Sequence, residues 1–168
     1  MPFIDVRGRA VYAECQGSGP AVLFLHGAGS NAATWWQQLP AFATRHTCIT
    51  VDQRCFGRSA APMDEFRHEL FTGDALAVLD HFGIGRAVVV GQSLGGMVGL
   101  RLALGHADRV AAFVACDSPL GVDHPAILRA LEERARTASA RTLEQRSLGA
   151  WFLQHHPERA ALYAQINH

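Results

Sequence analysis

The sequence predicts an α/β fold, with a doubly wound and mostly parallel sheet covered by helices. Two observations predict it. Short apolar runs that are continuous rather than alternating recur along the chain as far as Cys116, as is typical of strands buried on both faces. Helical patterns lie between these runs, so that strands and helices alternate in sequence.

The strands are expected in the following order. Two β-like runs with a turn around Gly8 between them predict an antiparallel hairpin at the start. Four buried strands follow, each within a continuous apolar run. The expected strands are Phe3–Val6, Val11–Cys15, Ala21–Leu25, Thr47–Val51, Ala87–Val90 and Val110–Cys116.

Three helical segments separate the four buried strands. Pro40 is expected to kink or restart the first of them. Gly83 and Gly105 follow the second and third, where a glycine commonly ends a helix. The expected helices are Ala33–Ala43, Glu65–Phe82 and Leu94–Leu104.

The pattern changes after residue 120. Residues 121–168 contain three helical segments and no run typical of a strand. Pro125 and Pro157 suit the first turns of two of them, and Thr142 with Gln145 fits a capping box that opens a helix through Phe152. Residues 1–120 are therefore expected to form the sheet domain, and residues 121–168 a helical insertion.

The composition excludes several classes of function. The 168 residues are 49% hydrophobic, enough for a sizeable core, and carry 15 basic and 15 acidic side chains, with no lysine among the bases. The absent lysine argues against a P-loop and a Schiff-base enzyme, and no basic patch predicts a nucleic-acid partner. No apolar run is long enough for a signal peptide or a membrane span, so a cytoplasmic protein with no membrane partner is expected.

The strongest chemical motif is Gly91-Gln92-Ser93-Leu94-Gly95, which joins an expected strand directly to an expected helix. A sharp turn at this place exposes a serine hydroxyl, and the flanking Gly91 and Gly95 avoid collisions with the neighbouring strand and helix. The positive end of the helix beneath Ser93 favours developing negative charge. The alternative is a serine in a phosphate-binding glycine-rich loop, but the spacing does not match that fingerprint.

Two further motifs follow strands in the same manner. His26-Gly27-Ala28-Gly29 comes directly after Ala21–Leu25, and Asp52–Ser59 comes after Thr47–Val51. With the Ser93 motif, in this order, they resemble the α/β-hydrolase superfamily, in its branch of cofactor-free esterases, lactonases and carbon–carbon-bond hydrolases. The resemblance implies that residues 1–120 are the N-terminal part of a hydrolase core and residues 121–168 its helical lid.

The resemblance also implies a role for each matching residue. Ser93 matches the nucleophile, and the backbone amides of Leu94 and Ala28 match the oxyanion hole. His26 matches the histidine that, with Gly27, supports the loop and is not the catalytic base. No metal and no organic cofactor is implied. The chain departs from the family at Cys55, where glycine is usual, and a positive φ there would cost about 1 kcal/mol.

Two other candidates stay open between a functional and a structural role. Asp117 follows Val110–Cys116, where some family members place the catalytic acid, but Cys116-Asp117-Ser118-Pro119 also resembles a strand end in which the aspartate is structural. His155-His156 could suggest a metal site, yet no third ligand has suitable spacing. Adjacent residues point in different directions on a helix, so a solvated helix end is expected there.

The family order places an acid and then a histidine after the serine, each behind a later strand. The stretch after Asp117 is instead mainly helical, and its histidines do not follow strands. The resemblance implies two further strands, whose absence would expose an apolar sheet edge. We therefore expect this chain to be inactive and unstable alone, and to need a C-terminal fragment of the same hydrolase as its partner.

The function expected from the sequence is a serine hydrolase that cleaves a small carboxylic ester, lactone or related carbonyl substrate through an acyl-enzyme. One alternative is a carbon–carbon-bond hydrolase of ring-cleavage products. Gly29-Ser30-Asn31 disfavours it, because that group usually has a proline in this loop. Another alternative is a non-catalytic binding protein on the same fold, although the intact serine motif argues against a decayed site.

Overall fold

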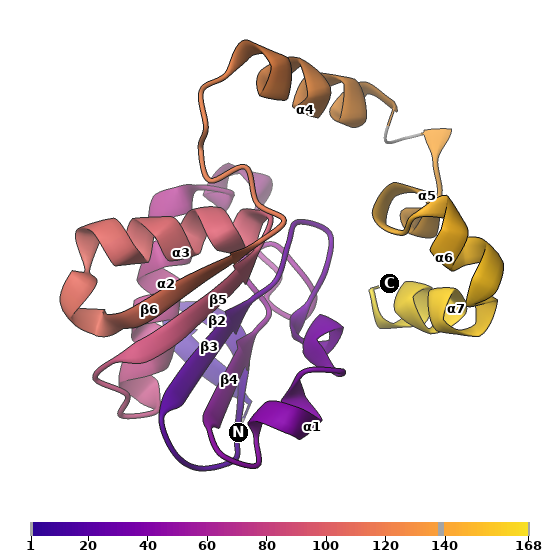
Figure 1. Ribbon diagram of the computed structural model, residues 1–168. Coiled ribbons are helices and arrows are strands. Elements are labelled where there is room, and N and C mark those ends of the chain that lie inside the picture. Colours follow the sequence, from indigo (N-terminus) through magenta and orange to yellow (C-terminus); the bar gives the residue numbers. More distant parts are fainter. Residues whose placement is uncertain (1, 138–139, 168) are drawn as a thin grey trace. The chain divides into compact units, whose positions relative to one another are not determined.

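The computed structural model describes residues 2–137 and 140–167. The chain divides into two compact units, Met1–Leu120 and Gly121–His168 (Figure 1). The first unit contains the sheet and the second contains helices.

The sheet of the first unit has six strands in the order β1-β2-β4-β3-β5-β6. The first two form an antiparallel hairpin, and β2 pairs antiparallel with β4. The remaining pairs are parallel, as the continuous apolar runs predict. The strands are β1 Phe3–Val6, β2 Arg9–Gln16, β3 Ala21–Leu25, β4 Thr47–Val51, β5 Ala87–Gln92 and β6 Val110–Cys116.

The register of the parallel strands brings their carboxyl ends together. Leu25 at the end of β3 pairs with Val51 of β4 on one side and Gly91 of β5 on the other. Gly91 pairs in turn with Ala115 of β6. The loops that follow these four strands therefore leave from the same edge of the sheet, where ligands bind in open α/β sheets.

Helices cover both faces of the sheet, as a doubly wound fold requires (Figure 1). The larger core lies on the face covered by α2 (His68–His81) and α3 (Leu94–Gly105). A smaller cluster lies on the other face, where Trp35 packs on Phe24 with ring centroids 5.1 Å apart. The 3-10 helix Ala32–Trp35 and the short helix α1 (Leu39–Phe42) supply this second layer.

Two helices differ from the sequence prediction in extent. The expected helix Ala33–Ala43 is two short pieces, since the chain restarts around Pro40 with α1. The expected helix Glu65–Phe82 begins at His68, because Arg67 is extended at φ −136° and ψ 137°. The residues before it form the 3-10 turn Met63–Glu65, and another short turn, Ala107–Arg109, precedes β6.

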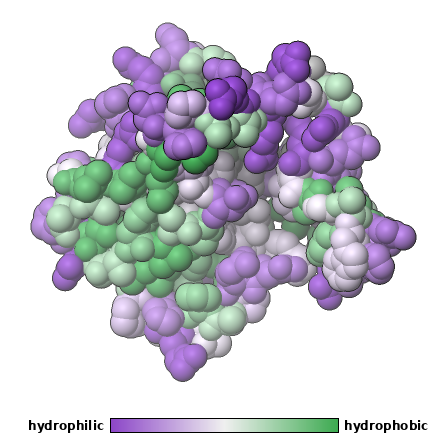
Figure 2. Space-filling model, turned by 45° about the horizontal axis from the view of Figure 1, so that its top comes forward, coloured by the Kyte–Doolittle hydropathy of each residue, from purple (hydrophilic) through white to green (hydrophobic). Residues whose placement is uncertain are grey.

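The prediction that Val110–Cys116 is buried on both faces is wrong. As β6, this strand lies at the edge of the sheet, and Val114 is 46% exposed. Burial of a strand depends on the neighbour at its side and the layer over its face, which an apolar run alone does not specify. Figure 2 shows a broad apolar area on the side of the molecule where Figure 1 places α3 and β6.

The described residues of the second unit include the helices α4 Pro125–Thr137, α5 Leu143–Ser147, α6 Ala150–His155 and α7 Pro157–Ile166. The expected capping box is present, since the Thr142 hydroxyl accepts from the Gln145 amide and the Gln145 side chain accepts from the Thr142 amide. The helix predicted from Thr142 through Phe152 is nevertheless two helices. Leu148 and Gly149 both have extended backbones. Leu148 is the C-cap of α5, and Gly149 is the N-cap of α6.

None of the helices in residues 2–137 and 140–167 combines the length and the hydropathy of a membrane span.

Cys55 has the left-handed backbone suspected from the sequence, with φ 69°. Its amide donates to the Ser59 carbonyl at 2.9 Å, which closes the turn after β4. A residue with a Cβ is strained in this region, whereas glycine is not.

We expect Cys55→Gly to raise the free energy of unfolding by up to about 1 kcal/mol, because it relieves this strain. Chemical denaturation with urea measures the change. Cys55→Ala is the matched control, since it removes the thiol but keeps the strained Cβ. An equal gain in both variants would assign the effect to the sulfur atom and not to the backbone.

Candidate active site

Four loops meet at the carboxyl edge of the parallel strands. They begin at His26 after β3, Asp52 after β4, Ser93 after β5 and Asp117 after β6. The site residues predicted from the three sequence motifs therefore come together at one place. The physical reason is the shared register of the four strands.

The Ser93 turn between β5 and α3 is strained and tightly packed. Ser93 has φ 49° and ψ −110°, a conformation that a residue with a side chain rarely adopts. A Cβ at Gly91 would lie 2.3 Å from the Gly95 carbonyl oxygen, and one at Gly95 would lie 2.1 Å from the Leu25 carbonyl oxygen. Both glycines of the motif are thus required for close backbone approach.

The loop after β3 lies directly against this turn. The Gly95 amide donates to the His26 carbonyl oxygen at 3.1 Å, which joins the first turn of α3 to the end of β3. A Cβ at Gly27 would lie 2.1 Å from Gln92 Oε1 and 3.2 Å from the Ser93 Cβ. Gly27 therefore lets the backbone of this loop pass close beside the serine side chain.

The two backbone amides predicted to form an oxyanion hole lie at the start of a helix and in a turn. Leu94 begins α3, where the first amides of a helix have no partner within it. Ala28 lies in a turn closed by the Ser30 amide on the Gly27 carbonyl oxygen, with Gly29 at φ 75°. Across residues 2–137 and 140–167, neither the Leu94 amide nor the Ala28 amide donates to another protein atom.

The His26 imidazole is fully buried and bound at both ring nitrogens. Its Nε2 accepts from the Gln53 amide at 2.9 Å, so the proton resides on Nδ1, which donates to the Gly27 carbonyl oxygen at 2.7 Å. Burial lowers the pKa of His26 to about 4. A neutral ring held in this way fixes the loop that carries Gly27 and Ala28.

Asp52 anchors the loop after β4. Its carboxylate accepts from the Ala32 amide at 2.7 Å and from the Arg58 amide and Nε at 2.8 Å each. Burial alone would raise the pKa of Asp52, but these hydrogen bonds and the Arg58 charge hold it below its usual value. A Cβ at Gly57 would lie 2.4 Å from the same carboxylate, so this glycine leaves room for it.

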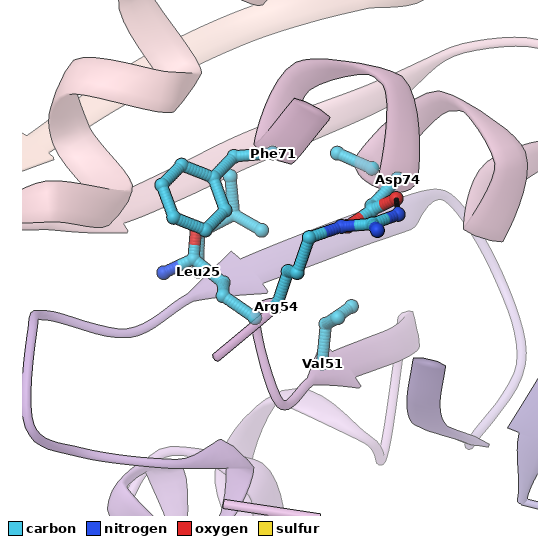
Figure 3. Close-up of a pocket in the computed structure, with 7 residues that line it drawn as sticks. Leu25, Val51, Arg54, Phe71 and Asp74 are labelled. Carbon is cyan, nitrogen blue, oxygen red and sulfur yellow. Dashed lines mark hydrogen bonds and ion pairs between the residues drawn. The ribbon is translucent and has the colours of Figure 1, made fainter. Parts of the chain in front are cut away.

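A buried ion pair that the sequence motifs do not predict lies beside this loop. Arg54 donates to Asp74 of α2 from Nε at 2.8 Å and from Nη2 at 2.6 Å, and Figure 3 shows the two side chains next to a small cavity. The hydrogen bonds to Asp74 raise the pKa of Arg54, which stays protonated. The motif contains Arg54, but no local pattern identifies Asp74, which lies 20 residues further along the chain.

Gln53 was also missed as a supporting residue. It is buried, and its Nε2 donates to the His26 carbonyl oxygen while its amide donates to the ring. Gln53 directly follows the strand-end Asp52. This position within the motif could have indicated that Gln53 supports the loop.

Asp117 lies in the loop after β6 and is exposed. The neighbouring Cys116 carbonyl oxygen accepts from the Ser93 amide at 3.1 Å. In the described part of the chain the Asp117 carboxylate has no hydrogen bond or ion pair, and within residues 2–120 no imidazole bonds to Ser93 Oγ. These residues therefore bring together a serine and two amides, but no general base.

The adjacent His155 and His156 make contacts within the second unit. The His155 ring stacks on Trp151 with centroids 4.5 Å apart, and His156 lies against Phe152 at 5.2 Å. Among the described residues, no group of three or more His, Cys, Asp or Glu side chains could hold a metal ion.

Comparison with protein families gives one match. The model described as the alpha/beta hydrolase fold matches residues 20–160, which is most of the chain. The matched segment includes all three sequence motifs.

Two curated relatives illustrate the range of similar enzymes. The 3-oxoadipate enol-lactonase 2 of Acinetobacter baylyi is 27% identical over 137 residues, which are 82% of this chain and 51% of that protein. An epoxide hydrolase of Caballeronia sordidicola is 36% identical over 119 residues, 69% of this chain and 36% of that protein. The chain thus spans about half or less of these relatives.

A solved structure agrees with the fold. The enol-lactonase from Burkholderia xenovorans LB400 superposes with a TM-score of 0.82 at 26% identity, over 99% of this chain and 67% of that one. The described part of this chain corresponds to an incomplete version of that fold.

We expect Gly95→Ala to lower the free energy of unfolding by at least about 2 kcal/mol, because the new methyl group would meet the backbone of Leu25. Gly73→Ala in α2 is the control, since a Cβ there meets nothing within 4 Å. That variant should be neutral or more stable by up to about 1 kcal/mol. Urea unfolding of both variants tests the pair, and similar losses would show that close approach at Gly95 is not the constraint.

We expect the buried His26 to make stability fall as the pH drops from 6.5 to 4. The folded pKa of about 4 lies below the ordinary 6.5, so the unfolded chain takes up the proton first and protonation favours unfolding. At 1.36 kcal/mol per pKa unit, the loss reaches about 3 kcal/mol at pH 4. The contribution of Asp52 disappears only at lower pH, below the ordinary 3.8.

The measurement is urea unfolding of the wild type and of His26→Asn between pH 7 and pH 4. The variant should lack the loss assigned to His26. NMR of the folded wild type provides an independent check, because the His26 ring signals should not titrate above pH 5. A midpoint near 6.5 would contradict the arrangement described for this ring.

Proposed function

The chain belongs to the alpha/beta hydrolase fold family, and on that premise we propose that it is the nucleophile-bearing part of a serine hydrolase acting on a small carboxylic ester, lactone or related carbonyl compound. The observation that carries the proposal is the strained Ser93 at the start of α3, with the unpartnered amides of Leu94 and Ala28 in the described residues beside it. Such an arrangement suits attack on a carbonyl carbon.

In the proposed reaction, Ser93 Oγ attacks the carbonyl carbon and transfers its proton to a histidine. The Leu94 and Ala28 amides donate to the oxyanion that forms. The bond to the leaving oxygen then breaks, the histidine returns the proton to that oxygen, and an acyl-enzyme remains. Water hydrolyses this ester to regenerate Ser93. The chemistry needs no metal and no organic cofactor.

The residues described leave this machinery incomplete, because Ser93 has no histidine partner within residues 2–120. We propose that a C-terminal segment of the same hydrolase, on this polypeptide or a second one, supplies the histidine and the acid. The partial coverage of the relatives supports this, as does β6, which pairs only with β5 among the described residues and is partly exposed. An exposed apolar edge favours pairing with a further strand.

A lactone is the narrower substrate class that the comparisons favour. Two of the similar proteins reported above are described as enol-lactonases. In a lactone the leaving oxygen stays attached to the acyl chain, so that the acyl-enzyme carries a free hydroxyl group. We therefore prefer a lactone among the possible ester substrates, and the experiment below measures the hydrolysis of both.

We expect the protein, including its C-terminal segment, to be labelled at Ser93 by a fluorophosphonate at least about 10³-fold faster than free serine. Ser93→Ala should abolish labelling and lower the hydrolysis of short esters and lactones by a comparable factor. Ser147→Ala, at an exposed serine of α5, is the matched control and should behave as wild type. Intact mass and peptide mapping locate the label.

Three outcomes would decide against parts of the proposal. Labelling at the rate of free serine would favour a non-catalytic binding protein on this fold. Full activity of residues 1–168 as an isolated monomer would exclude the need for a C-terminal segment. A carbon–carbon-bond hydrolase would be indicated by turnover of a dienoic ring-cleavage product with no turnover of esters or lactones.

A further inference from the structure

The end of β6 and the loop that follows it bind both backbone polar groups of Ser93. The Ser93 amide donates to the Cys116 carbonyl oxygen at 3.1 Å. The Ser118 hydroxyl donates to the Ser93 carbonyl oxygen at 2.7 Å. These contacts come from a segment about 25 residues beyond the Ser93 motif, and the motif does not predict them.

We propose that Ser118 is a positioning residue, whose hydroxyl keeps the nucleophile Ser93 in its strained conformation. The inference rests on the proposed function for its catalytic consequence. Ser118 has no proposed contact with the substrate and acts through Ser93.

Ser93 requires these contacts because its backbone conformation is energetically unfavourable. A residue with a side chain is strained at a left-handed φ, and Ser93 has φ 49°. Strained residues persist where surrounding contacts determine their conformation. The hydrogen bond that the Ser118 hydroxyl donates to the Ser93 carbonyl oxygen is a contact of this kind, and it opposes the strain.

Ser118 is itself held in place. The Leu120 amide donates to the Ser118 hydroxyl at 3.3 Å, so this oxygen both accepts and donates. Asp117 and Leu120 have φ 43° and 51°, which winds the chain tightly on both sides of Ser118. The loop thus carries strain of its own around the residue that contacts Ser93.

Gly96 provides an independent observation. It lies outside the five-residue serine motif, yet a Cβ there would lie 2.5 Å from both Cβ and Oγ of Ser118. The lack of a side chain at position 96 therefore lets Ser118 approach the first turn of α3. The Gly96 amide also donates to the Ser93 carbonyl oxygen at 3.0 Å, so that Ser118 joins an acceptor already used by the helix.

The test compares Ser118→Ala with Ser118→Thr in the protein that includes its C-terminal segment. The alanine variant lacks the donor, whereas threonine keeps it. Thr72→Val is the matched control, because the Thr72 hydroxyl donates to the His68 carbonyl oxygen at 2.8 Å within α2 and, among the described residues, makes no hydrogen bond to the Ser93 motif. The readouts are the rate constant for Ser93 labelling by an uncharged fluorophosphonate, and Tm.

We expect Ser118→Ala to label about tenfold more slowly, the equivalent of roughly 1.4 kcal/mol. Ser118→Thr should restore most of the labelling rate. Thr72→Val should label at the wild-type rate, although its Tm should change by about as much as that of Ser118→Ala. With an ester substrate, the alanine variant should lower kcat and leave KM unchanged. If the alanine variant does not fold, Ser118→Cys keeps the shape with a weaker donor and should label at an intermediate rate.

Wild-type labelling in Ser118→Ala would overturn the inference, and so would equal slowing in the alanine and threonine variants or in Thr72→Val. Hydrogen exchange of the Ser93 amide separates this result from a failure of the proposed function. If wild-type Ser93 is unreactive, the proposed function fails. Faster exchange in Ser118→Ala alone would then still support positioning, and unchanged exchange would refute it.

Discussion

The left-handed backbone of Ser93 is the constraint on which the rest of the site depends. It turns the chain from β5 into α3 within one residue and leaves the serine hydroxyl at the carboxyl edge of the sheet. Such a turn is possible only where the backbone of the helix packs directly against the backbone of the sheet. Gly91 and Gly95 permit that approach, and the bond from the Gly95 amide to the His26 carbonyl oxygen fixes it.

Buried polar groups then fix the neighbouring loops. The His26 ring links the loop after β3 to Gln53, and the Asp52 carboxylate links the loop after β4 to the 3-10 helix that begins at Ala32. Arg54 and Asp74 bind that same loop to α2 (Figure 3). Unpaired, such groups would each destabilise the fold, so their mutual satisfaction also makes the positions of the loops specific.

The two edges of the sheet differ in how well they are covered. At one edge the hairpin of β1 and β2 closes the fold, and the helices α2 and α3 cover a continuous core. At the other edge, β6 has no outer neighbour within the part of the chain that the structure describes, and Val114 is partly exposed. The site that we propose has the same asymmetry, because the nucleophile and the oxyanion amides lie in the described core while the acid and base are assigned to a further segment.

The sequence by itself determined the strand positions, the order of the motifs and the capping box at Thr142. These depend on apolar periodicity and on local hydrogen bonds, which neighbouring residues carry. Only the tertiary structure decided that β6 is an exposed edge, that Arg54 pairs with Asp74, and that Ser118 contacts Ser93. Each of these depends on which segments lie side by side in space, and the two side-chain contacts join residues 20 or more apart in the chain.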